Sequence, residues 1–146
     1  MKLSTRTRYG VRLMLDLACR YGDGPVYLKD IAVREGISEK YMSQIIIPLR
    51  SRGFVRSTRG AHGGYSLASP PARITLRDIM EPLEGGSALV DCVNQASVCH
   101  RSPTCATRDI WTMLGEKISE TLASVTLEDL VRMSTEKMEN NITQNI

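Results

Sequence analysis

The amino-acid sequence predicts a mainly α-helical fold that contains a single small β-hairpin. Along most of the chain the apolar residues recur every three or four positions, as they do on the buried face of a helix. Only between positions 54 and 68 do apolar and polar residues alternate, which is typical of paired strands. With 146 residues, of which 42% are hydrophobic, the chain has room for one compact domain and an appended element.

The N-terminal part of the chain is predicted to form three helices. A helix over 5–21 precedes a short helix over 28–35 and a third helix over 39–52. Gly36 is expected to end the short helix, because glycine readily adopts the left-handed conformation of a C-cap. The hydroxyl of Ser38 is expected to cap the third helix by accepting a free backbone N–H. Two helices joined by so tight a turn are typical of a helix-turn-helix.

The segment after the third helix is predicted to be a wing. Phe54–Ser57 and Gly64–Ala68 alternate as strands, and the residues between them form a basic, glycine-rich tip. The prediction is a winged helix-turn-helix that a helix capped by Thr75 completes. In order along the chain, the predicted units are a winged helix-turn-helix domain over 1–84, a cysteine-containing loop over 85–106, a long dimerisation helix with a short C-terminal helix over 107–138, and a flexible tail over 139–146.

The charge of the chain is distributed unevenly. Residues 1–80 contain 14 Lys and Arg against 6 Asp and Glu, a net charge of +8, whereas residues 81–146 contain 5 against 10, a net charge of −5; together these give the overall +3. A basic half of this kind is the electrostatic footprint of a polyanion-binding surface. The sequence therefore predicts that the N-terminal half binds double-stranded DNA.

Specific contacts to DNA are expected from the third helix and from the wing. Gln44 can pair with adenine, and Lys40 with guanine or phosphate. Arg59 at the wing tip suits the narrow, electronegative minor groove, whereas Arg56 suits a phosphate. The wing glycines also allow a simpler interpretation, in which they only satisfy turn geometry. The predicted contacts are Ser38, Lys40, Tyr41, Ser43 and Gln44 on the helix, and Arg56, Arg59, Gly60, His62 and Gly63 in the wing.

Cys92, Cys99 and Cys105 follow one another within fourteen residues. The chain shows neither a signal peptide nor a run of eighteen apolar residues, so a cytoplasmic location without a membrane contact is expected. In that reducing compartment, clustered thiols favour metal binding or redox chemistry over structural disulfides. We expect these three thiolates to bind an iron-sulfur cluster. Cys19 lies on the apolar stretch of the first helix and is expected to be a small buried hydrophobe.

The wing sequence Arg59-Gly60-Ala61-His62-Gly63-Gly64-Tyr65, the opening MKLSTRTRYG and the segment Ile37-Ser38-Glu39-Lys40-Tyr41 carry a family resemblance. The chain resembles the winged-helix repressors of the Rrf-two superfamily, specifically the IscR-type iron-sulfur cluster regulators, over residues 1 to about 133. The resemblance implies a homodimer whose long helices pack across a two-fold axis while each protomer binds one half-site. It also implies that the state of the cluster changes the affinity for DNA.

This resemblance leaves the fourth cluster ligand unknown. In IscR-type proteins a histidine three residues after the last cysteine completes the ligand set, and Arg108 occupies that position here. The nitric-oxide-sensing relatives use an N-terminal carboxylate of the partner subunit, but the matching residues 6–9 contain none. The candidates are His100, Asp91, Asp109, a partner residue, solvent or a small thiol. An open iron favours a 4Fe-4S cluster, with 2Fe-2S as the alternative.

Other functions remain open at this point. The cysteines could hold zinc, or two of them could form a disulfide switch. The chain could also be a metal-independent repressor that responds to a metabolite, or an iron-sulfur carrier, although a carrier has no use for a basic wing. His62 and His100 lack a paired nucleophile and acid, so no enzyme is expected. Trp111, on the long helix, is predicted to lie in the dimer interface, with packing near the cysteine loop as the alternative.

Overall fold

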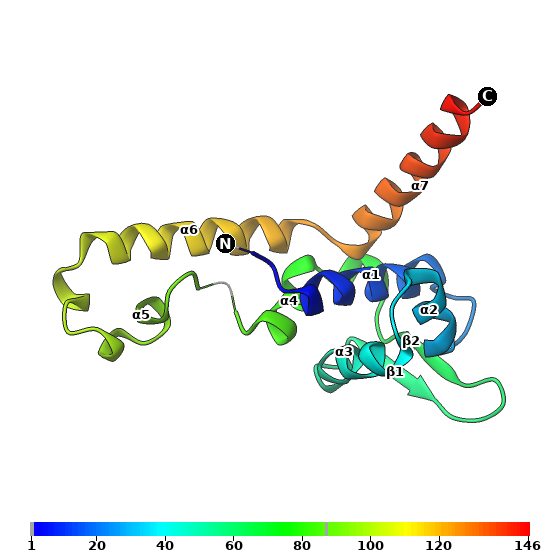
Figure 1. The fold of residues 1–146 in the computed structure, drawn as a ribbon, viewed down its shortest axis with the longest axis horizontal. Helices are drawn as coiled ribbons and strands as arrows, with labels where there is room; N and C mark the ends of the chain where they lie inside the picture. The colour runs from blue at the N-terminus through cyan, green and yellow to red at the C-terminus, as the bar shows by residue number, and fades with distance from the viewer. Residues whose placement is uncertain (1, 87) are drawn as a thin grey trace.

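The computed structural model describes residues 2–86 and 88–146 and confirms the mainly helical fold with one antiparallel hairpin (Figure 1). Helices α1 to α4 and the hairpin form the body, α6 extends away from it toward the cysteine loop, and α7 projects in another direction. The elements are α1 (Thr5–Cys19), α2 (Leu28–Glu35), α3 (Glu39–Ser51), β1 (Val55–Thr58), β2 (Gly64–Leu67), α4 (Leu76–Glu84), α5 (Asp91–Asn94), α6 (Ala106–Ser124) and α7 (Leu127–Gln144).

The core of the body lies between α1, α2, α3 and α4. Its side chains come from the positions that repeat with helical spacing, joined by one residue from each strand and by the first residue of α7. The fully buried ones are Leu13, Met14, Leu17, Ile31, Met42, Ile45, Ile46, Leu49, Leu67, Ile74, Ile79 and Leu127. Removing these surfaces from water is the main contribution to the stability of the body.

Local signals in the sequence place the helix-turn-helix as predicted. Gly36 has φ +65° and ψ +36°, the left-handed conformation that ends α2. The Ser38 hydroxyl accepts the backbone N–H of Tyr41 at 3.2 Å and so caps α3. Asp16 of α1 is 7% exposed and accepts two hydrogen bonds from Arg34 of α2, at 2.7 and 2.8 Å. This bidentate pair fixes the angle at which α2 lies on α1.

Hydrogen bonds connect the beginning of α1 to the end of α4. The Glu84 carboxylate, at the end of α4, accepts hydrogen bonds from the hydroxyls of Ser4 and Thr7 at the start of α1. These hydroxyls lower the pKa of Glu84, because they stabilise its charged form. Farther along, Leu127 N–H donates to the carbonyl of Ile74 at 2.9 Å, which holds the beginning of α7 against the body.

Two sequence predictions are wrong at this level. The last helix is not short: α7 spans 18 residues and continues to Gln144, through most of the segment expected to be a flexible tail. Nothing between Leu127 and Gln144 breaks a helix, so polar composition alone was a poor guide. Cys19 is exposed and not buried, because it lies on the face of α1 that carries the exposed Arg12, seven residues earlier. Within residues 2–86 and 88–146, the structure contains no helix that is long and apolar enough to cross a membrane.

Candidate nucleic-acid interface and cysteine loop

The outer face of α3 presents polar side chains to solvent. Lys40 and Gln44 are exposed one turn apart, while Ile45 and Leu49 on the opposite face are fully buried. Ser38 is exposed beside them at the N-cap. A helix held this way by its buried face offers its first turns to the major groove, where donors and acceptors of this kind can bind base edges.

Two of the predicted α3 contacts have roles within the protein as well. Tyr41 is half-buried, and its ring packs edge-on against Tyr9 with 6.1 Å between the centroids, so it belongs to the inward stripe as well as to the α3 surface. The half-buried Ser43 donates its hydroxyl proton to the carbonyl of Lys40 at 2.7 Å. The Ser43 oxygen keeps its acceptor lone pairs, so any DNA contact would use those.

The wing tip exposes its basic residues. Arg56 on β1 and Arg59 and His62 at the tip are all exposed. The strands pair Val55 with Leu67 through Thr58 with Gly64, and Gly63 N–H donates to the Gly60 carbonyl at 3.0 Å to close the turn. Arg59 therefore stands at the end of a paired hairpin, where a side chain can enter a groove, whereas Arg56 lies within the ladder opposite Ser66.

Gly63 differs from the other predicted wing contacts because it is buried. A Cβ atom built on it would lie 2.3 Å from the Thr58 carbonyl oxygen. Such a contact is far shorter than van der Waals distance, so only glycine fits here without a shift of the backbone. This favours turn geometry, and not a direct DNA contact, as the role of Gly63. Gly60, with φ +110°, is exposed and can do both.

The structure adds residues that the sequence did not single out for function. Val26 and Tyr65 exchange two backbone hydrogen bonds of 2.8 Å, which join the α1–α2 connection to β2. The hydroxyl of Tyr27 donates to the Ala61 carbonyl at the wing tip. These contacts hold the wing at one angle to α3. No motif in the sequence connects these segments.

The three clustered cysteines lie on different short elements. Cys92 is in α5, Cys99 follows the 3₁₀ turn Ala96–Val98, and Cys105 is the N-cap residue of α6. All three are partly exposed free thiols. Arg108, at the expected position of a fourth ligand, donates from Nε to the carbonyl of Cys92 at 2.8 Å. Its role in this structure is to tie α5 to the start of α6.

Cys105 has a chemically distinct environment. The Thr107 hydroxyl lies 3.2 Å from its Sγ atom and lowers the pKa of the thiol, and the backbone N–H of Arg108 adds to this effect. Hydrogen bonds at a helix N-terminus stabilise the thiolate over the thiol. Because the thiolate is the form that binds metals and attacks disulfides, Cys105 is prepared for either chemistry.

The loop contains the thiolate donors that an iron-sulfur cluster needs, but this conformation does not bring them together. Of the described residues, no three His, Cys, Asp or Glu side chains are grouped closely enough to hold a metal ion. The predicted cluster site is therefore not assembled by this conformation. Along the loop, the 3₁₀ turn Ala96–Val98 lies between Cys92 and Cys99, and a second 3₁₀ turn, Ser102–Thr104, lies between Cys99 and Cys105. Ser102, between Cys99 and Cys105, has a buried Oγ atom with no partner among the described residues. A buried hydroxyl without a partner indicates a loop that is completed by another group or another conformation.

These features define a class of protein: a winged helix-turn-helix DNA-binding protein with a cysteine-bearing arm. Comparison with known proteins places it more narrowly. The sequence profile of the Rrf2 family, described as "Iron-dependent Transcriptional regulator", matches residues 3–133. The chain belongs to the Rrf2 family.

Individual relatives agree with this assignment. The chain is 44% identical over 132 residues to protein rrf2 of Nitratidesulfovibrio vulgaris, with 90% of this chain and 88% of that protein covered. It is 42% identical to the HTH-type transcriptional regulator CymR of Bacillus subtilis, with 89% of each covered.

Solved structures show the same fold. The structure of B. subtilis CymR, whose title calls it the global cysteine regulator, has a TM-score of 0.77 at 41% identity and covers 91% of this chain and 98% of that one. The structure of T. potens IscR has a TM-score of 0.77 at 42% identity and covers 94% and 90%. These relatives are transcriptional regulators and not enzymes, which confirms the winged-helix regulator predicted from the sequence.

Proposed function

We propose that this protein is a homodimeric transcriptional repressor whose affinity for a DNA operator is controlled through Cys92, Cys99 and Cys105. The observation that carries the proposal is the joint presentation of an exposed α3 face and an anchored basic wing by a member of a regulator family. The proposal includes the cytoplasmic location expected from the sequence, because a regulator must share a compartment with the DNA that it binds.

In this proposal α3 enters the major groove and the wing tip contacts the neighbouring minor groove. Lys40 and Gln44 supply base-edge hydrogen bonds, and the N-terminal end of α3 faces the phosphates, where its free N–H groups are favourable. Arg59 inserts where A·T-rich sequence narrows the minor groove. Arg56 and the other basic residues of the body supply the salt-dependent part of the affinity.

The homodimer is supported by the surface of α6. Ile110, Trp111, Met113 and Leu114 are each between 39% and 49% exposed in a single chain. A contiguous exposed apolar surface is typical of a protein interface. Two protomers related by a two-fold axis would present two α3 helices to half-sites about one helical turn apart, roughly 34–36 Å.

An iron-sulfur cluster is the controlling group that we favour. The family description refers to iron, the three thiolates are the right donors, and the unpartnered Ser102 hydroxyl lies among them. When bound, a cluster supplies redox and ligand-exchange chemistry. The chain would supply Cys92, Cys99 and Cys105 as ligands. The fourth remains open because Arg108 occupies the usual histidine position, and a guanidinium has no lone pair with which to bind iron. Ordering this loop would fix α6, and with it the spacing of the two α3 helices.

A second candidate is control by thiol chemistry without a metal. It is favoured by the likeness to CymR, by the lowered pKa of Cys105 and by the absence of a grouped ligand set in the part of the chain that the structure describes. Oxidation of two of the three thiols would change the same loop. An iron-sulfur carrier is disfavoured, because it would not need Arg59 or the anchored wing.

Anaerobic purification followed by visible absorption and iron and sulfide analysis separates these candidates. We expect a coloured protein whose iron is lost when Cys92, Cys99 or Cys105 is changed to Ala. An operator selected from random DNA is then titrated with the metal-loaded, metal-free and oxidised forms at fixed salt. Different affinities of the loaded and free forms support the cluster, whereas a colourless protein whose affinity changes only on oxidation supports the thiol mechanism. Equal affinity of all three forms would contradict control through the loop.

A further inference from the structure

One exposed isoleucine lies on the α3 surface that the proposed function assigns to DNA. Ile47 is 61% exposed, whereas Ile45, Ile46 and Leu49 of the same helix are between 0% and 2% exposed. An isolated apolar side chain on a protein surface is common and needs no function by itself. Ile47 differs from other exposed apolar residues of the body because polar side chains suited to DNA stand on both sides of it.

Ile47 continues the exposed polar row of α3. Lys40, Gln44 and Ile47 follow one another at spacings of four and three residues, and all three are exposed, so they share one face of the helix. Arg50, three residues farther on, is also exposed. The isoleucine therefore stands between a side chain that can pair with adenine and one that can bind a phosphate. DNA that is bound by Lys40 and Gln44 also meets Ile47.

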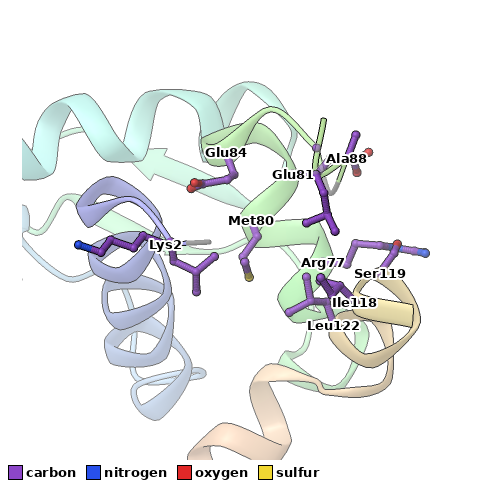
Figure 2. Close-up of a pocket in the computed structure, with 12 residues that line it drawn as sticks. Lys2, Arg77, Met80, Glu81, Glu84, Ala88, Ile118, Ser119 and Leu122 are labelled. Atoms are coloured by element: carbon purple, nitrogen blue, oxygen red, sulfur yellow. The ribbon is translucent and has the colours of Figure 1, made fainter. Parts of the chain in front are cut away.

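The α3 surface is separate from the apolar surface at the junction of the body with α6. A cavity of about 350 Å³ lies at that junction, with Met80 of α4 and Ile118 and Leu122 of α6 in its wall (Figure 2). Among the described residues, none from α3 or the hairpin lines this cavity. A substitution at Ile47 therefore changes the DNA-binding surface and leaves the junction with α6 intact.

We propose that Ile47 contacts the C5-methyl group of a thymine in the major groove and so makes the operator specific at that base pair. The proposal rests on the DNA binding in the proposed function. The thymine methyl is the apolar group that a base edge presents in the major groove, and apolar side chains recognise it by contact. A β-branched side chain in a helix strongly prefers one χ1 rotamer, so Ile47 loses little freedom when it makes this contact.

The place of this thymine follows from helix geometry. Gln44 and Ile47 are three residues apart, which is about 4.5 Å along the axis of a helix. Successive base pairs are about 3.4 Å apart. Ile47 therefore reaches the base pair that Gln44 binds or one of its neighbours. The proposal predicts a thymine in each half-site, at or next to the base pair whose identity Gln44 selects.

The test replaces the thymines of an operator selected from random DNA by uracil, one position at a time. Uracil keeps the hydrogen-bonding edge of thymine and lacks only its C5-methyl group. Affinities at fixed salt are measured for wild type, Ile47→Ala and Val33→Ala, the last of which removes an exposed β-branched side chain from α2 as a matched control. A second selection with Gln44→Ala identifies the base pair that Gln44 reads, and circular dichroism checks that each variant is folded.

Uracil at the predicted position should lower the affinity of wild type about fourfold per half-site, the equivalent of roughly 0.8 kcal/mol for one methyl or methylene group returned to water. Ile47→Ala should bind the thymine operator more weakly by at least this factor and should not distinguish thymine from uracil there. Val33→Ala should keep the full difference.

Two results would overturn this proposal and leave the proposed function standing. One is a wild-type protein that is indifferent to uracil at and next to the Gln44 base pair. The other is an Ile47→Ala protein that still distinguishes thymine from uracil by the wild-type factor. If wild type binds no DNA sequence specifically, the proposed function and this proposal are both wrong.

Discussion

The body of this protein, formed by α1 to α4 and the hairpin, buries its large apolar residues. The arm, which consists of the cysteine loop and α6 (residues 88–124), leaves many of them exposed. In the body, Leu13, Ile45 and Ile79 are fully buried against other elements of the same chain. In α6, all of whose residues the structure describes, Gly115 alone is buried, and the large side chains Trp111 and Met113 are exposed. The body therefore buries its apolar residues within the single chain, whereas the arm leaves apolar surfaces that another chain or a bound group could cover.

This contrast separates two tasks. A surface that binds DNA must hold its side chains at fixed positions, and the body does so with buried contacts, caps and the anchored wing. A segment that responds to a signal needs more than one arrangement of similar free energy, which is easier to achieve where few contacts are buried. If this contrast holds, substitutions in the body should change stability and DNA binding most, and substitutions in the arm should change thiol chemistry and leave DNA binding by the metal-free form unaltered.

The largest effect is expected from Gly64→Ala in the body. A Cβ atom there would lie 2.5 Å from the Val26 carbonyl oxygen, at a φ of +141°. Destabilisation of about 1–3 kcal/mol is expected, together with a marked loss of operator affinity, because the wing must leave its anchor. Gly53→Ala is the control, since its φ is also positive but no atom lies within 4 Å of the new Cβ. Thermal unfolding and DNA titration measure both, and equal effects of the two changes would show that the anchor is unimportant.

Arg59→Ala tests the wing tip itself. We expect operator affinity to fall about tenfold, and the slope of log affinity against log salt to decrease by about 1, because one phosphate-neutralising charge is lost. Folding stability should stay the same, since Arg59 is exposed. Arg132→Ala, which removes a charge from α7 in the acidic half, should leave DNA binding unaltered. If Arg59→Ala binds as tightly as wild type at physiological salt, the wing does not contact the operator.

Tyr27→Phe examines whether the wing is held in place from the α1–α2 connection. Losing the hydrogen bond to the Ala61 carbonyl should lower operator affinity about threefold, in line with a net value of roughly 0.5–1.5 kcal/mol for such a bond. Combined with Arg59→Ala, the change should have little additional effect, because Tyr27 acts through the wing tip. Tyr21→Phe is the control from the same connection. Additive effects of the two changes would mean that Tyr27 acts elsewhere.

The smallest effect is expected in the arm, from Thr107→Ala. The Thr107 hydroxyl lowers the pKa of Cys105, so its removal should move the pH profile of Cys105 alkylation to higher pH and slow the reaction at neutral pH. The rate is followed by peptide mass spectrometry on the metal-free protein. Thr112→Ala, whose hydroxyl donates to the Arg108 carbonyl farther along α6, serves as the control. An unchanged profile would show that Thr107 does not activate this thiol. DNA binding by the metal-free form should be the same in both variants, because Thr107 and Thr112 lie on α6, outside the α3 and wing surfaces.

The sequence predicts correctly those features that depend only on residues close together in the chain. The Ser38 cap, the Gly36 turn and the helical spacing of Ile45 and Leu49 each depend on neighbours within about one helical turn, and all are found in the structure. The exposed α3 face follows from the same spacing, since a residue that is not on the buried stripe faces solvent. The hairpin was predicted because its alternation and glycines lie within fifteen residues.

One error came from a local signal that was not used. Cys19 was expected to be buried from its place in an apolar stretch, but it lies seven residues after the exposed Arg12, on the solvent face of α1. Contacts between distant segments could not be predicted from the sequence at all. No local pattern could show that the Tyr27 hydroxyl meets the wing tip, because these residues are 34 positions apart.

By itself, then, the sequence determined the helix-turn-helix, the hairpin and the long α6, which helix face is free for DNA, and which thiols are candidates for control, since each of these depends on residue type and short-range spacing. Tertiary structure alone decided how the wing is anchored, that Arg108 binds the Cys92 carbonyl, and that Trp111 stays exposed in the single chain. The physical reason is that hydrogen bonding and burial between distant segments depend on how whole elements pack, and packing is a property of the assembled surfaces.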